Sequence, residues 1–508
     1  MLAHAVPRQS WCLPLVGLVA VLLCLPFRRS IFSMGDEGVL LHGAQRMLQG
    51  DRLYADFFEF LPPGGFVLTE IWLRIAGLSV LSVRTLAIVT VAGIACFTFL
   101  ACRLASRNAP LSAALAILWV IMSQGVWTQL SHHWLTTMFS MMGMWAALAN
   151  VEQAGSRWRW PLIAGVASGT ASMVTPTCGA LAMLAALTAF VSTRRHRAAL
   201  IVFVAAGVLV PAGLLLYLIW RQALVAGFND VIVFTASQYA PMQGVPYGHW
   251  ASAQNAPFIY VFPLAAIVTF AVAVRGRHDR MLLPCAAFAL SGLIACFPRP
   301  DVFHIAFEVP LACPLLACCA VRLTEAWRPA YRAAAVAVLA ALLLPSIFAF
   351  CLYTQQVSRA EVMPTPRGGM AFFQLDGAPE VLARIAALPP GDGWFFYPFM
   401  PMMPFLSGQD HVSRYDILTP GYSLPAQYRD ACESVTRRAV WVVVDRRWMD
   451  ADFLNQVFPA LRDSRPPEVT AFEAVLDHGF DLVARDGTFE LRHRRNDLSD
   501  TVCTTVMR

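Results

Sequence analysis

The sequence contains no lysine: all 38 basic residues among its 508 are arginine. This absence excludes lysine Schiff-base and lysine general-base chemistry, and any phosphate must be bound by arginine, histidine or backbone groups. Charged residues are also scarce, at 14% against about 25% in an average soluble domain, whereas hydrophobic residues reach 57%. The composition therefore excludes an ordinary soluble globule, intrinsic disorder, a collagen-like repeat and a small disulfide scaffold.

The few charges are distributed unevenly along the chain. Residues 11–353 contain 21 Arg and 12 acidic residues, whereas the shorter stretch 354–508 contains 16 Arg and 20 acidic residues. This change in composition predicts a membrane domain over 1–353, followed by a soluble domain over 354–508. The positive excess of the first part is better explained by membrane topology than by nucleic-acid binding, so no nucleic-acid partner is expected.

Apolar stretches long enough to cross a bilayer recur throughout the first part. We predict about eleven spans, at 11–27, 83–102, 109–127, 133–151, 160–175, 176–192, 199–220, 256–274, 281–297, 303–320 and 333–353. The first is followed by Phe27-Arg28-Arg29-Ser30, which is not a small-residue cleavage site, so it is expected to be an uncleaved span. The chain is therefore predicted to be a polytopic α-helical membrane protein.

Arginines in alternate loops predict the orientation of these spans. One set of loops, with the N-terminus, holds fourteen arginines: Arg8, Arg103, Arg107, Arg157, Arg159, Arg194, Arg195, Arg197, Arg275, Arg277, Arg280, Arg322, Arg328 and Arg332. The opposite short loops hold only Arg221 and Arg299. The positive-inside rule therefore places the N-terminus in the cytoplasm and the first loop and the tail outside.

The first outer loop, 28–82, has helical periodicity. Residues 37–49 and 63–76 each place apolar side chains on one face and are followed by a glycine, Gly50 or Gly77. Both segments are predicted to be amphipathic helices in the membrane interface. A second outer segment, about 221–255, ends in a Pro/Gly/Tyr-rich stretch and is expected to be a mobile loop.

The tail alternates helical and strand patterns. Helices are predicted near 378–388 and 425–438, and strands at 394–397 and 440–444. The segments 480–485 and 488–493 flank Asp486-Gly487, which predicts a hairpin with a type I′ turn. The tail is therefore expected to be a small α/β domain without a convergent polar site, in an accessory role without chemistry of its own.

Ten of the thirteen cysteines lie in apolar segments, and Cys351 ends another. None has zinc-ligand spacing, so most are expected to be small buried side chains. Cys432 and Cys503, the two in the tail, can form a disulfide if the tail is outside the cytoplasm.

Polar clusters at the predicted outer ends are the candidates for chemistry, since charges near a bilayer are costly. Each has a structural alternative. Asp36 can be a helix cap, His132 and His133 can be interfacial side chains, and Arg299 can form a surface ion pair with Asp301. His304 lies one turn into an apolar segment, where a polar side chain without a role is less expected.

The run Gly35-Asp36-Glu37, the helix after it, Gly50-x-x-x-Tyr54-x-Asp56-Phe57 and Pro62-Pro63-Gly64 together resemble the first outer loop of GT-C superfamily glycosyltransferases. In particular, the pattern looks like that of the bacterial relatives of aminoarabinose transferase and protein O-mannosyltransferase. Arg84, the run Arg299-Pro-Asp301-x-x-His304 and, in the tail, Tyr397-Pro-x-x-Pro401 with Leu406-x-Gly408 also fit this resemblance.

The resemblance implies a GT-C-like fold in a bacterial inner membrane, with a periplasmic C-terminal domain. It implies inverting transfer of a sugar from a polyprenyl-phosphate donor to a hydroxyl of a glycolipid, polysaccharide or protein. Asp36 would be the general base, supported by Glu37 and kept ionised by Arg28 or Arg29. The expected contacts to the donor phosphate and substrates are Arg299, Asp301, His304, His132, His133, Tyr54 and Asp56.

Two departures from the relatives bear on phosphate and metal binding. Thr175-Pro176-Thr177 stands where relatives often have a lysine, and His132-His133 stand where some have an acidic metal ligand. No metal site and no cofactor are therefore assigned, and a divalent metal ion is left open.

Two other functions are compatible with a polytopic membrane protein. A transporter or flippase of lipid-linked sugars would need polar residues at mid-membrane depth and internal repeats. A membrane protein without catalysis, whose outer domain binds a partner, would leave the acidic outer loop unexplained.

Overall fold

The computed structural model describes residues 11–153, 158–192, 197–252, 255–274, 280–389, 391–461, 465–499 and 502–503. These residues group into two compact units. Unit 1 is drawn from the ranges 1–28, 85–216 and 246–359, and unit 2 from 29–84, 217–245 and 360–508.

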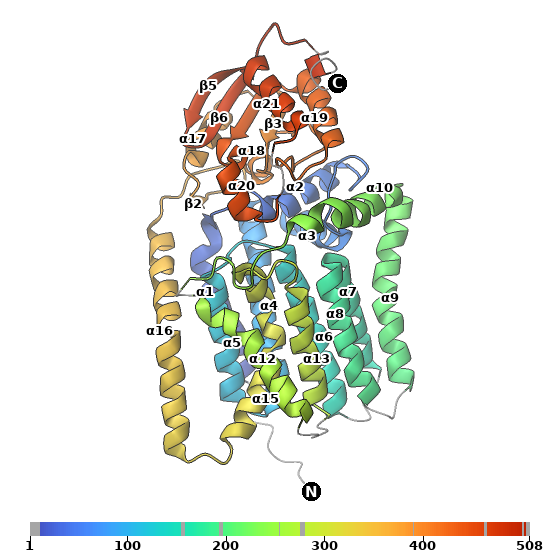
Figure 1. Cartoon of the computed structure of the whole chain (residues 1–508), viewed down its shortest axis with the longest axis vertical. Helices are drawn as coiled ribbons and strands as arrows, with labels where there is room; N and C mark the ends of the chain where they lie inside the picture. Colours follow the sequence, from blue (N-terminus) through green and yellow to red (C-terminus); the bar gives the residue numbers. More distant parts are fainter. Residues whose placement is uncertain are drawn as a thin grey trace. The chain divides into compact units, whose positions relative to one another are not determined.

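Unit 1 is helical, and every one of the eleven predicted segments is a helix or a broken helix (Figure 1). Its elements are α1 (Cys12–Cys24), α4 (Val80–Ser106), α5 (Ala109–Gln124), α6 (His132–Glu152), α7 (Arg159–Val174), α8 (Pro176–Ser192), α9 (Arg197–Trp220), α12 (Ala256–Val274), α13 (Leu282–Ala295), α14 (Val302–Glu308), α15 (Cys313–Thr324) and α16 (Pro329–Arg359). The first residues of α4 and the last of α9 belong to unit 2.

Four of the described helices are long and apolar enough to cross a membrane: α1 with the short helix after it, α4, α9 and α16. A fifth span results if the bent pair formed by Val302–Leu311 and Cys313–Thr324 counts as one. Helices α5, α8, α12 and α13 are apolar but shorter. The structure therefore describes a multi-pass helical membrane protein, and the number of eleven spans stays a prediction.

The predicted span 303–320 is broken. Helix α14 passes through a short 3-10 turn, Val309–Leu311, into α15 with a bend of 60°. Pro310 and Pro314 lie on either side of the bend, and a proline has no N–H to continue the helical hydrogen-bond ladder. The break follows Glu308, which is buried.

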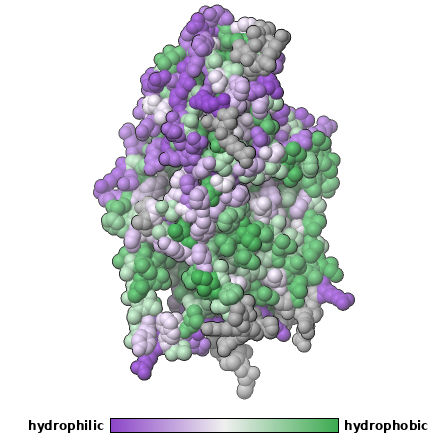
Figure 2. Space-filling view, in the orientation of Figure 1, coloured by the Kyte–Doolittle hydropathy of each residue, from purple (hydrophilic) through white to green (hydrophobic). Residues whose placement is uncertain are grey.

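The helices of unit 1 carry exposed apolar side chains on their outer faces. Leu209 and Leu216 on α9 and Leu342 and Phe348 on α16 are each more than 60% exposed. The face in Figure 2 accordingly has green, apolar residues over the helices of this unit. Such a surface is typical of contact with lipid chains.

Some of the fourteen arginines that we predict to face the cytoplasm lie within the described residues. Arg107, Arg280 and Arg322, from three loops assigned to the same side, line one pocket of unit 1. This grouping agrees with the predicted alternation of the loops. Six of the fourteen, Arg8, Arg157, Arg194, Arg195, Arg275 and Arg277, lie outside the described residues.

Unit 2 contains a mixed four-stranded sheet in the order β3 (Trp394–Tyr397), β4 (Trp441–Asp445), β6 (Phe489–Arg494) and β5 (Phe480–Asp486). Strands β3 and β4 are parallel, and the other two pairs are antiparallel. The helices of the tail are α17 (Ala378–Ala386), α18 (Met402–Ser407), α19 (Pro425–Arg438), α20 (Ala451–Val457) and α21 (Pro467–Gly479). The predicted helices and strands of the tail are thus found at their predicted places, and Cys432 and Cys503 form a disulfide.

The predicted hairpin is present, but its predicted turn type is wrong. Asp486 pairs with Phe489, so the turn residues are Gly487 and Thr488. Of these residues only Gly487 has a positive φ, whereas a type I′ turn needs two successive positive values. Asp486 stays in the strand because the hairpin extends one pair further than the sequence pattern indicates.

The first outer loop folds together with the tail in unit 2. Helix α2 (Asp36–Gln49) packs on α18, and the amide of Met402 donates to the carbonyl of Met34 at 2.9 Å. Strands β1 (Ser30–Ile31) and β2 (Ala371–Phe372) pair in parallel, and the amide of Phe58 donates to the carbonyl of Arg414 at 2.8 Å. The loop and the tail therefore belong to one compact unit, and removing the tail would remove the packing partners of the loop.

The two predicted helices of the first loop differ in their surroundings. Helix α2 is enclosed, and of its residues only Asp36 and Gln49 are exposed. Helix α3 (Pro63–Ala76) leaves Ile71 and Ile75 exposed by 51% and 81%. An apolar face suited to a membrane interface is thus found on α3, and the position of both helices in a bilayer stays a prediction.

The second outer segment is helical over 224–242, where a loop was expected, and irregular over 243–252. It forms α10 (Leu224–Phe228), a π-helix (Asn229–Tyr239) and α11 (Ala240–Met242). Phe234 packs on Phe58 of the first loop, with ring centroids 5.0 Å apart, and Tyr239 packs on Phe60 at 4.8 Å. These aromatic contacts within unit 2 explain the order of the segment.

Gly38 provides a test of the packing between α2 and α18. A Cβ atom at Gly38 would lie 2.2 Å from the backbone nitrogen of Met402, so Gly38→Ala must separate the two elements. We expect a destabilisation of about 1–3 kcal/mol, measured as a lower melting temperature of the purified chain. Gly213→Ala is the control, because nothing lies within 4 Å of that Cβ position. Equal melting temperatures of the two variants would contradict the described packing.

Candidate functional site

Asp36 opens helix α2 and is exposed, whereas the residues after it are buried. The N-cap position is occupied by Gly35, which makes no side-chain cap bond. The alternative that Asp36 is the helix cap is therefore wrong, because the helix begins one residue earlier than that role requires. A carboxylate in the first turn of a helix is favoured by the helix dipole, and Asp36 lies at this position.

Glu37 is fully buried and forms an ion pair with Arg84 at the start of α4. Arg84 also donates to the carbonyl of Ser30 at 2.9 Å, so one guanidinium joins the beginning of α2 to the strand before it. Burying two charges is costly unless they are paired and hydrogen-bonded, as they are here. The Glu37–Arg84 pair thus fixes the start of α2, and the buried carboxylate of Glu37 does not reach solvent.

A buried hydrogen bond connects α2 with the tail. Nδ1 of His42 donates to Asp416 at 2.6 Å, and Nε2 of His411 lies 3.7 Å from the other oxygen of that carboxylate. Burial alone would raise the pKa of Asp416, but His42, His411 and Arg46 lower it to about 2. This pair was not predicted, since its partners are separated by 374 residues.

Tyr54 and Asp56, predicted to contact substrate, have structural partners. The ring of Tyr54 is buried, and its hydroxyl donates to the carbonyl of Leu61 at 2.7 Å. Asp56 accepts from the Arg52 side chain at 2.8 and 3.0 Å, and these bonds lower its pKa. In this structure Tyr54 has a packing role, whereas Asp56 remains partly exposed.

Glu59 is a buried carboxyl that the sequence analysis did not assign. It is fully buried, and neither of its side-chain oxygens has a hydrogen-bond partner among the described residues. Burial, together with the charge of Asp416, raises its pKa well above the ordinary value. Asp230 lies near it, and burial raises the pKa of Asp230 to about 7. The signal in the sequence is an acid inside the aromatic run Phe57-Phe58-Glu59-Phe60.

In unit 1, the predicted phosphate-binding residues lie together around the start of α14. Asp301 is the N-cap and accepts from the backbone amide and Nδ1 of His304 at 2.9 and 2.8 Å. Nε of Arg299 donates to the other oxygen of Asp301 at 2.9 Å, and its guanidinium lies over the ring of Trp250. Burial would raise the pKa of Asp301, but His304 and Arg299 lower it. The predicted Arg299–Asp301 pair is thus present, with Asp301 buried and the Arg299 side chain 12% exposed.

His132 and His133 belong to the same cluster. They begin α6, where Ser131 is the N-cap, and the ring of His133 lies 4.8 Å from that of His304 and 4.8 Å from that of Phe307. Three imidazoles, one guanidinium and one carboxylate therefore share one region of unit 1. The sequence analysis named all five residues, but their contact across separate segments required the fold.

Glu308 was missed by the sequence analysis. It lies one helical turn after His304, at the end of α14, and is buried. An ionisable residue inside an apolar run is an expected marker of function in membrane proteins, so this rule could have identified it.

Among the residues that the structure describes, no group of three or more His, Cys, Asp or Glu side chains is placed to hold a metal ion.

The tail, contrary to expectation, contributes to a polar cavity. A pocket of about 740 Å³ in unit 2 is lined by Phe32, Ser33, Met34, Gln374, Leu375, Asp376, Asp445, Arg447, Trp448, Phe453, Thr488 and Phe489. Its aromatic wall continues toward Asp36: the ring of Trp448 lies 5.0 Å from that of Phe399, which fills the space beside Gly35. The sequence analysis missed this site because its lining comes from four distant segments.

Substitution of Glu59 tests whether its carboxyl is protonated in the folded chain. Because the folded pKa is raised, stability is fully present below the unfolded pKa of about 4.5 and falls as the pH rises above it. Glu59→Gln removes this dependence. At pH 8 we expect the variant to be more stable than wild type. The difference in the free energy of unfolding should be up to about 1.4 kcal/mol for each pH unit above the unfolded pKa. Near pH 4 the two proteins should have equal stability in thermal unfolding. A variant less stable than wild type at pH 8 would show that Glu59 is ionised and paired.

Comparisons with known proteins give a fold but no sequence family. No family model and no curated protein matches the chain in sequence. Among solved structures, ArnT from Cupriavidus metallidurans, bound to undecaprenyl phosphate, matches with a TM-score of 0.57 at 14% identity, over 97% of this chain and 99% of that one.

The arabinofuranosyltransferase AftD from Mycobacteria matches with a TM-score of 0.51 at 16% identity. The match covers 98% of this chain but 40% of AftD, so the chain spans about two-fifths of that protein. Both matches extend over nearly all of this chain and include both of its units. The chain has the fold of the GT-C glycosyltransferases.

Proposed function

We propose that the chain is an inverting membrane glycosyltransferase. It would transfer a sugar from a polyprenyl-phosphate donor to a hydroxyl of a glycolipid, polysaccharide or protein at the outer face of a bacterial inner membrane. The observation that carries the proposal is the exposed Asp36 at the start of α2, held by the buried Glu37–Arg84 pair, in a chain with the GT-C fold. The undecaprenyl phosphate bound to ArnT supports a donor of this chemistry.

In the proposed reaction, Asp36 accepts the proton of the acceptor hydroxyl as the oxygen attacks the anomeric carbon. The bond from that carbon to the phosphate oxygen breaks, and the configuration inverts in a single displacement. The leaving polyprenyl phosphate carries the negative charge. No enzyme nucleophile and no metal ion is assigned a role.

Arg299 and His304, with His132 and His133, are proposed to bind the donor phosphate. A guanidinium offers several N–H donors in a planar fork that suits phosphate oxygens, and the imidazole N–H groups add further hydrogen-bond donors. Asp301 orients Arg299 and His304 through its hydrogen bonds to both. The base and the phosphate ligands belong to different units, and a separate variant tests each role.

The cavity in unit 2 is proposed to bind the acceptor. Aromatic rings stack on sugar faces, whereas Asp376, Asp445 and Arg447 can bind hydroxyls. The volume of about 740 Å³ is within the usual range of small-molecule sites. The tail would thus guide the acceptor through this cavity.

The outer-face location is supported by two observations. The Cys432–Cys503 disulfide is typical of a compartment more oxidising than the cytosol. Arginines from three loops predicted to be cytoplasmic gather in one pocket of unit 1.

One observation favours a transporter of lipid-linked sugars as a second candidate. The bent pair α14–α15, with buried Glu308 at the bend, is a discontinuous helix of the kind found at transport sites. Proteoliposomes distinguish the two functions: a transporter moves the intact lipid-linked sugar across the bilayer, whereas the transferase releases polyprenyl phosphate.

Asp36→Asn tests the general base. The amide has nearly the same shape but cannot accept the proton, so we expect normal folding and donor binding with a rate reduced by roughly 10²–10⁴-fold. Asp51→Asn, the same change in the same loop at a carboxylate paired with Arg46, is the control and should retain the wild-type rate. Transfer by Asp36→Asn within a few-fold of wild type would reject the role.

Arg299→Ala tests the phosphate ligands. Asp301 keeps His304 as a partner, so the local fold should survive. Loss of a charge-assisted bond should weaken binding of polyprenyl phosphate by about 1.5–3 kcal/mol, or roughly 10–150-fold. Arg328→Ala, an exposed arginine elsewhere, should leave binding unchanged. Unchanged affinity in Arg299→Ala would remove this residue from the site.

Trp448→Ala tests the acceptor cavity. With glycolipid extracted from the source membrane as acceptor, the half-saturating acceptor concentration should rise at least fivefold, while donor hydrolysis without acceptor stays constant, because only one wall of the cavity is lost. Trp327→Ala, at an exposed tryptophan of unit 1, should change neither quantity. Unchanged acceptor dependence in Trp448→Ala would place the acceptor elsewhere.

A further inference from the structure

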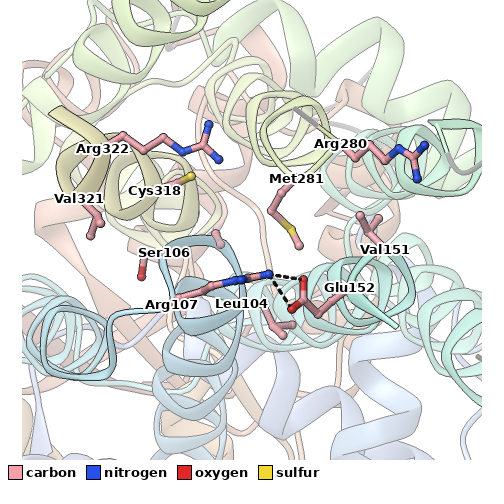
Figure 3. A pocket seen from close by; sticks show the side chains of 11 residues that line it. Leu104, Ser106, Arg107, Val151, Glu152, Arg280, Met281, Cys318, Val321 and Arg322 are labelled. Carbon is pink, nitrogen blue, oxygen red and sulfur yellow. Dashed lines mark hydrogen bonds and ion pairs between the residues drawn. The ribbon is translucent and has the colours of Figure 1, made fainter. Parts of the chain in front are cut away.

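Unit 1 contains a pocket of about 420 Å³ that the proposed reaction does not use (Figure 3). Its walls come from the ends of α4, α6 and α15 and from the residues before α13. The lining residues are Leu104, Ala105, Ser106, Arg107, Val151, Glu152, Arg280, Met281, Cys318, Val321 and Arg322.

The charged side chains of the pocket are mostly basic. Arg107 donates to both oxygens of Glu152, at 3.1 and 3.4 Å, and Glu152 is the one acidic residue among the described lining residues. Figure 3 shows Arg280 and Arg322 on either side of Met281, apart from that pair. Within the described part of the chain, Arg280 makes no hydrogen bond or ion pair. Three guanidiniums and one carboxylate thus favour an anionic ligand.

The pocket lies at the end of a spanning helix. Helix α4 has 27 residues, or about 40 Å at 1.5 Å per residue, and is among the helices that can cross a membrane. Its last residue, Ser106, lines the pocket together with the end of α15. A pocket at this point is at the depth of lipid headgroups, since 40 Å is about the thickness of a bilayer with its polar layers.

The remaining lining is apolar. Leu104, Met281 and Val321 form part of the wall next to the arginines. A free anion would be bound by the charged side chains alone, whereas a phospholipid also presents a glycerol backbone and the first methylenes of its acyl chains. Basic pockets between helices at the cytoplasmic side are the usual binding sites of anionic headgroups.

We propose that this pocket binds the phosphate of an anionic phospholipid headgroup. Arg107, Arg280 and Arg322 would bind the phosphate oxygens through charge-assisted hydrogen bonds, and the apolar wall would contact the glycerol and upper acyl chains. Because the ends of α4, α6 and α15 and the residues before α13 all contribute to the pocket, a bound lipid would hold these segments together. The inference does not depend on the proposed sugar transfer.

The test uses the full chain in detergent micelles, with dioleoyl phosphatidylglycerol as the probe and dioleoyl phosphatidylcholine as the neutral comparison. Binding is measured by native mass spectrometry and by the rise in melting temperature. The pocket variant is Arg107→Gln/Arg280→Gln/Arg322→Gln. The matched control is Arg159→Gln/Arg328→Gln/Arg332→Gln, which removes the same charge from unit 1 outside the pocket.

We expect wild type and the control to bind phosphatidylglycerol at least tenfold more tightly than phosphatidylcholine, and the pocket variant to lose this preference. Arg280→Glu alone should weaken binding at least fivefold, and it breaks no described contact. Equal binding of the two lipids by wild type, or an equal loss in the control, would overturn the proposal. Full displacement of the lipid by millimolar inorganic phosphate would also overturn it, since the ligand would then be the free anion.

Discussion

The buried ion pair between Glu37 and Arg84 is the interaction on which the candidate site depends most. It joins the first turn of α2 to the beginning of α4, and the same guanidinium binds the carbonyl of Ser30 in β1. Breaking a buried pair by removing one partner typically costs about 3–5 kcal/mol, because the other charge remains uncompensated. The geometry of Asp36, one residue before Glu37, is therefore fixed by a strong interaction that is itself hidden from solvent.

The packing of the tail on α2 also fixes the start of this helix. Gly35 and Gly38 allow Phe399 and the backbone of Met402 to approach α2, and His42 is paired with Asp416. The first outer loop thus obtains its rigidity from a tail more than 300 residues away. An exposed carboxylate on such a support is well suited to a reaction that requires a fixed base, since a general base must lie within hydrogen-bond distance of the proton it removes.

The sequence predicts local structure well and long-range contacts poorly. Helix α3 begins and ends where its Pro63 and Gly77 indicate, and the tail helices and strands follow their apolar periodicity. In contrast, the pairing of His42 with Asp416 and the order of β3-β4-β6-β5 depend on segments far apart in the chain. The helix at 224–242 was missed because its stability comes from aromatic contacts of Phe234 and Tyr239 with other segments. The same limit applies to single residues. The raised pKa of Glu59 depends on its burial and on neighbours such as Asp416, which only the fold brings close to it.

The central claim is that this chain consumes a polyprenyl-phosphate sugar. The most direct measurement places the purified full chain in lipid nanodiscs with isotope-labelled polyprenyl-phosphate arabinose or mannose and follows the lipid product by mass spectrometry. The account predicts that free polyprenyl phosphate accumulates with at least one of the two donors when membrane glycolipid is present, and that the label appears in the glycolipid. Persistence of both donors unchanged, in preparations that bind polyprenyl phosphate and remain folded, would contradict it.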